Sequence, residues 1–378
     1  MADNKDKKVL NVPHLRFPEF CGEWEMASLQ DIAAVNPKSN PLQNSFVYID
    51  LEAVEKGELR KIQEVMREEA PSRAQRVIYK NDILFQCVRP YQKNNYIHKI
   101  QSKSNQQWVA STGYAQIRTT EIPNYIYHLL NTDGFNRKVM VRCTGSSYPA
   151  INSEDLATIR FYLTTDTKEQ FKISRLLDLL DERIATQNKV IEKLKSLIKG
   201  LRVSLMQIEN GNIVHLGEIA QIYQPQTISS TELTEDGFLV YGANGIIGKY
   251  KQYNHKTEQI CITCRGNTCG MVNYTKPMSW ITGNAMVINT DEHQNKVCKR
   301  YLYHYLSAYN FNSIISGSGQ PQIVRTPLEQ LKVPLPTFLE QKQKATFLDK
   351  IQGKIEISNK TLNLYLQQKQ YLLRQMFI

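Results

Sequence analysis

Two copies of one module follow each other in this sequence, and this repeat constrains the fold more than any other feature. The segment TGSSYPAINSEDLATIRFYLTT from Thr144 aligns with SGSGQPQIVRTPLEQLKVPLPT from Ser316. Further landmarks match in the same order along the chain: Trp108 with Trp280, Tyr125 with Tyr301, and His128 with His304. Because the matches keep their order across the 378 residues, we predict two similar domains rather than one large core.

Each copy ends in a long stretch with the pattern of a coiled-coil helix. Residues 168–206 contain no proline, and apolar residues recur there at alternating steps of three and four. The predicted seam of this helix is Ile173, Leu177, Leu180, Ile184, Gln187, Ile191, Leu194, Ile198, Leu201 and Leu205. The matching seam of the second copy is Leu348, Ile351, Ile355, Ser358, Leu362, Tyr365, Lys369, Leu372 and Met376. A helix of roughly 58 Å needs an equally long partner for its apolar stripe.

The connection between the copies predicts how the two helices run. The second module starts where the first helix ends, because only the short link 207–211 intervenes. A compact second module therefore returns its own helix antiparallel to the first. In that arrangement the polar seam residues Gln187 and Ser358 should face one another and set the register. The two modules would lie at opposite ends of a rod, related by a pseudo-twofold axis.

The globular parts, 12–165 and 209–338, have the patterns of strands and turns. Strand patterns such as 77–85 are separated by turn signals such as 316–319, and short helices are predicted at 125–130 and 301–306. We therefore predict the α/β (α+β) class with curved sheets. The predicted segments are a first domain at 1–165, a first spacer helix at 166–208, a second domain at 209–338 and a second spacer helix at 339–378.

Charge and cysteine content indicate the class of partner and the compartment. A formal net charge of +11 favours a polyanionic partner, nucleic acid first, although a basic surface that contacts only water fits the same number. Seven scattered cysteines, an odd number, suit thiols in a reducing cytoplasm. The N-terminal segment lacks the apolar core of a secretory signal, and no stretch has the length of a membrane span. We expect a cytoplasmic protein without membrane contact.

Motifs for catalysis or metal binding are not visible in the sequence. The glycine-rich stretch 242–250 lacks the spacing of a phosphate-binding loop and its magnesium-binding Ser or Thr. Cys261, Cys264 and Cys269 resemble part of a zinc site, but no second pair follows. Strand alternation would also place Cys261 and Cys264 on opposite faces. The pattern favours binding rather than turnover, with no cofactor or metal in this chain.

A two-module chain with two long helices resembles the specificity subunits of type I restriction–modification enzymes, and the resemblance covers essentially the whole chain. The motifs that carry it are VPHLRFPEFCGEW from Val12, NDILF from Asn81, VRPY from Val88, YGANGIIG from Tyr241, RGNTCG from Arg265, GQPQI from Gly319 and LPTFLEQ from Leu335. The chain departs modestly from the family pattern: Thr164 stands where the second copy has Pro336, and cysteines replace common residues at 261, 264 and 269.

The resemblance implies separate roles for the modules, the helices and the partner subunits. Each module would recognise one half of a gapped, two-part site in double-stranded DNA, and the antiparallel helices would fix the distance between the halves. Two methyltransferase subunits would dock on the helices and modify adenines with S-adenosylmethionine. Two motor–nuclease subunits, using ATP with magnesium, would cut unmodified DNA. The chain itself would be a non-catalytic subunit.

Polar and basic residues in predicted loops are the candidates for DNA contact, because arginine can hold guanine, and Asn or Gln can hold adenine, through two hydrogen bonds. In the first module they are Arg89, Lys93, Ser111, Thr112, Tyr114, Ser146, Ser147 and Tyr148. In the second they are Asn244, Lys249, Arg265, Asn267, Gln320 and Gln322.

A structural role competes with each of these assignments. Any of the basic residues can be a solvated surface charge, and the glycines at 145 and 317 fit tight turns. Trp108 and Trp280 are predicted to pack in the core, and His128 and His304 to be structural. Two other functions stay open: a scaffold that joins proteins without DNA, and an enzyme with an atypical motif.

Overall fold

The structure is a computed structural model that describes residues 11–100, 106–207, 212–317 and 319–378. It divides into two compact units. Unit 1 comprises Met1–Gln187 and Thr361–Ile378, and unit 2 comprises Asn188–Lys360. Each unit thus contains one globular module and a part of both long helices. The predicted boundary between residues 208 and 209 lies outside the described residues, as does Ser318 of the predicted turn.

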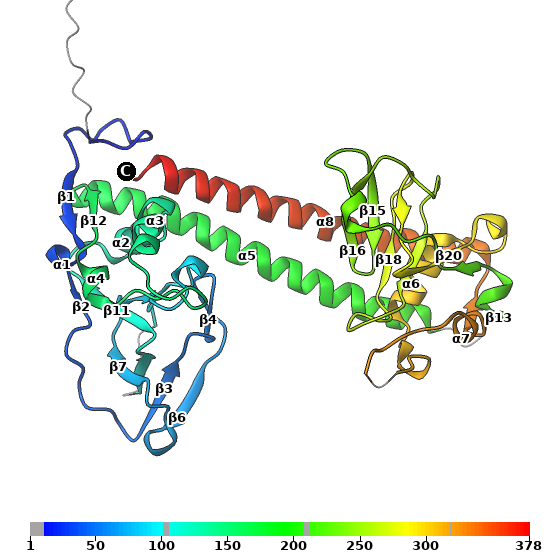
Figure 1. Cartoon of the computed structure of the whole chain (residues 1–378), viewed down its shortest axis with the longest axis horizontal. Helices are drawn as coiled ribbons and strands as arrows, with labels where there is room; N and C mark the ends of the chain where they lie inside the picture. The colour runs from blue at the N-terminus through cyan, green and yellow to red at the C-terminus, as the bar shows by residue number, and fades with distance from the viewer. Residues whose placement is uncertain (1–10, 101–105, 208–211, 318) are drawn as a thin grey trace, which may run out of the picture. The chain divides into compact units, whose positions relative to one another are not determined.

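The first module packs two sheets against each other (Figure 1). One has the order β6 (Gln63–Met66), β3 (Ser45–Ile49), β10 (Gln107–Ser111) and β7 (Ala74–Ile78). The other has the order β2 (Ala33–Val35), β11 (Tyr114–Thr119), β8 (Ile83–Gln86) and β9 (Tyr96–Ile97). β3 and β10 are parallel, and the other pairs are antiparallel. Trp108 is buried in this core, as predicted.

The second module repeats this plan. One sheet has the order β16 (Gly245–Tyr250), β15 (Phe238–Gly242) and β19 (Trp280–Ile281), again with one parallel pair, β15 with β19. The other has the order β14 (Gln221–Tyr223), β20 (Ala285–Asn289), β17 (Ile260–Thr263) and β18 (Val272–Tyr274). Trp280 pairs with Val240 on β15 and is buried, the counterpart of Trp108 on β10. The prediction of a mixed α/β fold with two repeated domains is confirmed.

Shorter elements complete each module. The first has the pair β1 (Glu25–Ser28) and β12 (Arg160–Leu163), the hairpin β4 (Val54–Glu55) and β5 (Glu58–Leu59), and the helices α1 (Leu29–Ile32), α2 (Pro123–Leu130), α3 (Asp133–Val141) and α4 (Ser153–Ala157). The second has the pair β13 (Asn212–His215) and β21 (Lys332–Leu335), and the helices α6 (Lys299–Ala308) and α7 (Arg325–Glu329). α2 and α6 contain the two predicted short helices.

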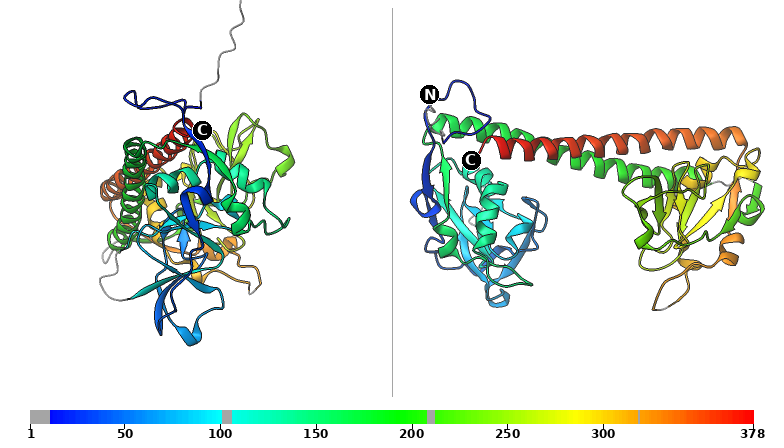
Figure 2. Two further views of the ribbon diagram at one scale, coloured as in Figure 1. Left: turned by 90° about the vertical axis from the view of Figure 1, so that its left-hand side faces the viewer. Right: turned by 45° about the horizontal axis from the view of Figure 1, so that its top comes forward.

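The two long helices are α5 (Thr167–Met206) and α8 (Phe338–Gln375). In unit 1, the start of α5 lies against the end of α8 (Figure 2). Lys369 of α8 pairs there with Asp181 of α5 at 2.5 Å. In unit 2, the end of α5 lies against the start of α8, and Lys344 donates to the carbonyl oxygen of Leu205. The two helices therefore run antiparallel within each unit.

Every residue of the two predicted seams is buried or half-buried. The helix boundary differs from the prediction at one of them, because α8 ends at Gln375 and the buried Met376 follows it. Met376 and Phe377 lie in the core of unit 1 with Trp24 and Tyr125. The pairing of Gln187 with Ser358 joins residues of different units and stays a prediction.

Two buried glutamines, at matching places of the repeat, attach α2 and α6 to the long helices. Gln170 of α5 accepts from the backbone of Ile122 and donates to the carbonyl oxygen of Thr164. Gln341 of α8 accepts from the backbone of Cys298 and donates to the carbonyl oxygen of Pro336. Both side chains are almost completely buried, so each satisfies backbone groups that would otherwise lose their hydrogen bonds.

Two histidine–aspartate pairs make the same attachment about two turns further along each long helix. His128 Nε2 lies 2.9 Å from Asp178 Oδ1, and His304 Nε2 lies 2.8 Å from Asp349 Oδ1. Burial lowers the pKa of both histidines, so each is a neutral donor to its carboxylate. Burial alone would raise the pKa of Asp349, but hydrogen bonds from His304 and Arg300 outweigh it and hold the pKa at about 2. The predicted structural role of the two histidines is confirmed.

The three cysteines at 261, 264 and 269 do not lie together on one face. Cys261 packs with Tyr241 and Ile281, whereas Cys264 and Cys269 belong to the core on the opposite face of β17. Among the described residues, no three His, Cys, Asp or Glu side chains group as metal ligands would. Along the same described chain, no helix combines the length and apolar composition that a membrane span requires.

Candidate nucleic-acid interface

Three loops meet at one edge of the first module, and together they form its loop surface: residues 87–89, 111–113 and 144–150. The backbone of Cys87 links all three. Its N–H donates to the carbonyl oxygen of Gly113, at 3.0 Å, and its carbonyl oxygen accepts from Ile151, also at 3.0 Å. Thr144 and Ala150 exchange two backbone hydrogen bonds of 2.9 Å, which close the third loop. Loops fixed in this way present side chains from a rigid base.

The second module has an equivalent loop surface, formed by residues 264–266, 282–284, 316–317 and 319–322. The N–H of Cys264 lies 3.5 Å from the carbonyl oxygen of Asn284, and its own carbonyl oxygen accepts from Ile323 at 3.0 Å. Ser316 and Gln322 exchange backbone hydrogen bonds of 2.9 and 2.8 Å, which close the third loop. The repeat therefore preserves the backbone of this surface, while its side chains differ between the modules.

A glycine with positive φ is required at the same place in both third loops. Gly145 has φ +89° and Gly317 has φ +90°. A Cβ atom at position 145 would lie 3.0 Å from the carbonyl oxygen of Tyr148, and one at 317 would lie 2.5 Å from that of Gln320. The predicted role of these glycines as tight-turn residues is confirmed.

Arg89 and Tyr148 are the most prominent predicted contacts of the first loop surface. Arg89 adopts the left-handed conformation, with φ 53°, which is strained for a residue with a side chain. Its guanidinium lies 4.3 Å from the centre of the Tyr148 ring, and Tyr148 is 63% exposed. Ser146 and Ser147 are exposed beside it, and Thr112 is half-buried in the neighbouring loop. A cation held on an exposed aromatic ring suits a nucleic-acid partner.

Three other predicted contacts of the first module have internal roles. Tyr114 is completely buried, and its hydroxyl donates to the carbonyl oxygen of Asp50. Ser111 is 3% exposed, and its Oγ accepts from Gly113. Lys93 is bound by Asp133, at 2.6 Å, and by the carbonyl oxygen of Asn131. The alternation of β10 and β11 turns the first two inward, and the ion pair engages the lysine.

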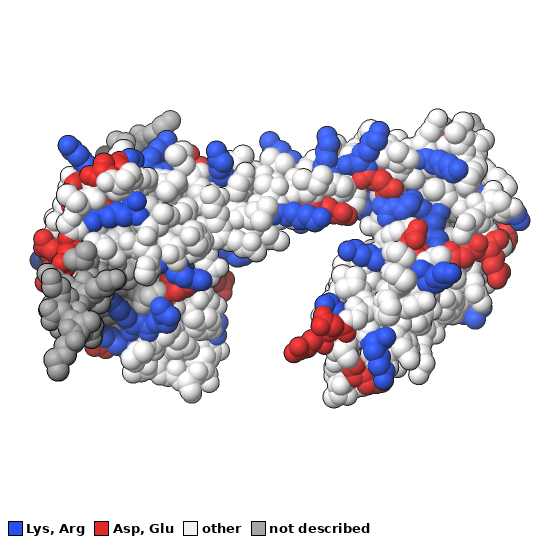
Figure 3. Space-filling view, turned by 90° about the horizontal axis from the view of Figure 1, so that it is seen from above, with Lys and Arg blue, Asp and Glu red and all other residues white. Residues whose placement is uncertain are grey.

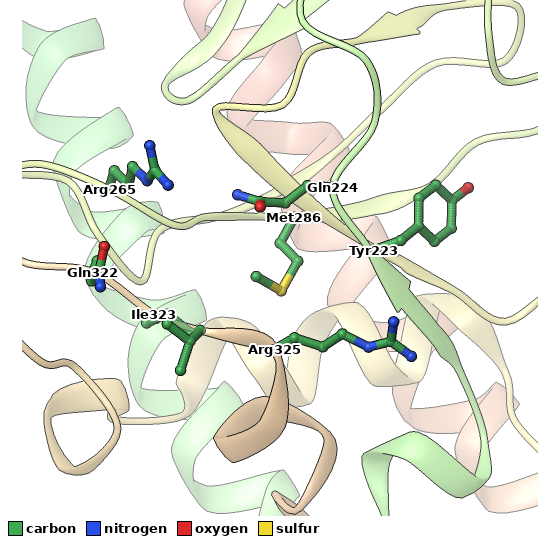
Figure 4. Close-up of a pocket in the computed structure, with 8 residues that line it drawn as sticks. Tyr223, Gln224, Arg265, Met286, Gln322, Ile323 and Arg325 are labelled. Atoms are coloured by element: carbon green, nitrogen blue, oxygen red, sulfur yellow. The ribbon is translucent and has the colours of Figure 1, made fainter.

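In the second module, Arg265 and Gln322 line a surface hollow of about 370 Å³ (Figure 4). Arg265 is exposed, and no side chain within the described residues forms an ion pair with it. Gln224 also lines the hollow, and its amide lies between Arg265 and Met286 in the view. Its Nε2 donates to Gly283 O and Cys264 Sγ, which leaves Oε1 as an acceptor. The hollow therefore offers both donors and acceptors, as readout of base edges requires.

The remaining predicted contacts of the second module are not part of the lining of this hollow. Asn267 and Gln320 are exposed in or next to its loops. Asn244 is exposed in the hairpin turn before β16, and Thr263 fixes that turn by donating to Ala243. Lys249 lies 3.3 Å from Asp236, but both side chains are exposed, so this pair is weak and the lysine stays available.

Sequence reasoning missed Gln224 and two arginines, Arg73 and Arg76. The backbone of Thr112 donates to the carbonyl oxygen of Arg73, which brings this exposed residue to the first loop surface. Arg76 pairs with Ala110 across β7 and β10, directly before the loop at 111–113. The spacing RAQR immediately before a predicted strand was the available signal. The predicted strand begins at Val77, and both arginines precede it.

Charge is not gathered into one patch on the face drawn in Figure 3. Lys and Arg side chains are interleaved there with Asp and Glu in both units. The net charge of +11 is therefore a weaker guide than the unpaired guanidiniums at the loop surfaces.

Comparison with known families agrees with this geometry. A profile described as "Type I restriction modification DNA specificity domain" matches the chain twice, at residues 22–196 and 209–366. The chain belongs to this family of type I specificity subunits. Each match contains one loop surface and a part of one long helix, so the repeat found in the sequence is the repeat of the family domain.

Curated members of the family are similar to parts of the chain. The EcoprrI specificity subunit of Escherichia coli is 32% identical over 140 residues, 36% of this chain and 34% of that protein. A putative specificity subunit of Haemophilus influenzae, S.HindORF215P, is 27% identical over 161 residues, 40% of this chain and 41% of that protein. The aligned regions thus span less than half of either relative.

Solved structures share the fold. The type I S subunit of M. genitalium is 16% identical, with a TM-score of 0.65 over 97% of this chain and 99% of that one. A chain from a study of complex assembly and conformational transition in a type I system is 20% identical, with a TM-score of 0.57 over 93% of this chain and 96% of that one.

Proposed function

We propose that this chain selects the DNA sequence for a type I restriction–modification complex and that each module reads one half of a gapped, two-part site. The observation that supports this most is the duplicated loop surface. Two equivalent backbone platforms with different side chains suit two different half-sites, because phosphate contacts need only charge whereas base contacts need particular donors and acceptors.

The long helices support a spacing role in the same proposal. Each module is attached to them by a buried glutamine and a histidine–aspartate pair, so a module cannot turn freely on its helix. Two methyltransferase subunits would dock along the helices and supply S-adenosylmethionine. Two motor–nuclease subunits would add ATP- and magnesium-dependent cleavage. This chain would then contribute binding and no catalytic group.

The direct test is to express the chain with methyltransferase subunits of its system and to map methylated adenines across the host genome. We expect a two-part, gapped motif that disappears when the chain is omitted. If the proteins are soluble and associated but no such motif arises, the proposal is wrong, and a scaffold role becomes the better explanation.

A further inference from the structure

Arg76 is a half-buried guanidinium for which the protein supplies no counter-charge. Its Nε is buried without a hydrogen-bond partner, and among the described residues no carboxylate forms an ion pair with Arg76. Burial lowers its pKa, which means that the charged form is disfavoured where it lies. The titratable side chain beside it is Cys87, whose pKa burial raises to about 11, so the neutral thiol cannot compensate the charge.

The position of Arg76 connects this uncompensated charge with the first loop surface. Arg76 lies opposite Ala110, and a bulge follows between Ala110 and Ser111, where bulges commonly redirect side chains. Cys87, its neighbour, is the residue whose backbone links the three loops. Neither Nη group is among the completely buried atoms that lack a partner, and no hydrogen bond among the described residues engages them, which leaves both as donors for a ligand.

We propose that Arg76 reads a guanine in the half-site of the first module, through its two Nη groups. This rests on the proposed function and names one recognition residue within it. Guanine presents two acceptors, O6 and N7, in the major groove, and a guanidinium can donate to both. Arg73, exposed at the rim, suits a phosphate instead. DNA binding would supply hydrogen-bond acceptors for the Arg76 guanidinium, which has none within the described residues of the free protein.

The direction in which the thermal midpoint shifts distinguishes a DNA-recognition role of Arg76 from a structural role. Arg76→Met keeps the volume and removes the charge, so we expect the thermal midpoint of unit 1 in the full chain to rise by about 2 °C. With the methyltransferase subunits present, we expect methylation of the cognate site to fall about tenfold or more. Arg76→Lys keeps the charge but not the fork, and we expect the motif to relax at one G·C pair.

Arg118→Met is the matched control. Arg118 binds the buried Asp82 at 2.7–2.8 Å, so its loss should lower the thermal midpoint. A similar loss in Arg76→Met would make Arg76 structural and overturn the inference. A uniform fall in methylation with an unchanged motif would indicate a phosphate contact and would overturn it as well. If the wild-type chain directs no gapped motif, the proposed function itself fails, which is a different result.

Discussion

Phe377, near the end of the second repeat, completes the core of the first module, and its removal tests that arrangement. The side chain is 6% exposed, and its ring lies 5.4 Å from Tyr125 and 6.2 Å from Trp24 between ring centres. Replacing a buried phenylalanine with alanine costs about 3–5 kcal/mol. The segment after α8 can shift to fill part of the cavity, so we expect the lower value for Phe377→Ala. A loss of about 3 kcal/mol corresponds to a roughly 100-fold increase in the equilibrium constant for opening of this core.

Hydrogen exchange on the full chain measures this opening separately in each unit. We expect amides of β1, β12 and α2 to lose about 100-fold in protection, while β17 and β20 of unit 2 keep theirs. Tyr371→Ala, on α8 shortly before this segment and 58% exposed, should change the stability of neither unit by more than about 0.5 kcal/mol.

Met206 gives the reciprocal experiment. It ends α5 at the place equivalent to Phe377, is 5% exposed, and packs with Tyr301 in unit 2. Met206→Ala should therefore weaken unit 2 and spare unit 1. Equal losses in both units from either variant, or no loss in unit 1 from Phe377→Ala, would refute the reasoning.

Three other predictions follow from the seam, the repeat and a buried histidine. Leu180→Asp places a charge in the helix seam and should abolish methylation of every site, whereas Leu179→Asp, at a 41% exposed position, should be tolerated; normal methylation by the first variant would contradict the packing. Exchanging residues 209–338 for the module of another family member should change one half of the methylated motif; a change in both halves would mean that the modules do not read independently. Burial lowers the pKa of His98 to about 4, so the unfolded chain takes up a proton first as pH falls below 6.5. Protonation of this histidine should lower the free energy of unfolding of unit 1 by about 2 kcal/mol between pH 7.5 and 5. Urea unfolding of wild type and His98→Gln at both pH values measures the difference.

The features that depend on local periodicity could be predicted from the sequence alone. The repeat required two domains, and the three-and-four spacing required two long helices with opposed apolar stripes. Strand alternation placed Cys261 and Cys264 on opposite faces, and both tryptophans entered the cores as expected. Such patterns depend on the geometry of one helix or strand, which a contiguous segment of sequence specifies.

The tertiary structure decided which residues of the loops are available and which arginine lacks a partner. Lys93 and Arg76 look alike in the sequence, yet Asp133 neutralises the first and no described carboxylate neutralises the second. Tyr114 follows a turn but is turned into the core, and Phe377 reaches a core begun more than 350 residues earlier, at Trp24. These outcomes depend on contacts between segments distant in the chain, and burial and charge pairing at a site are sums over such contacts, which no local pattern contains.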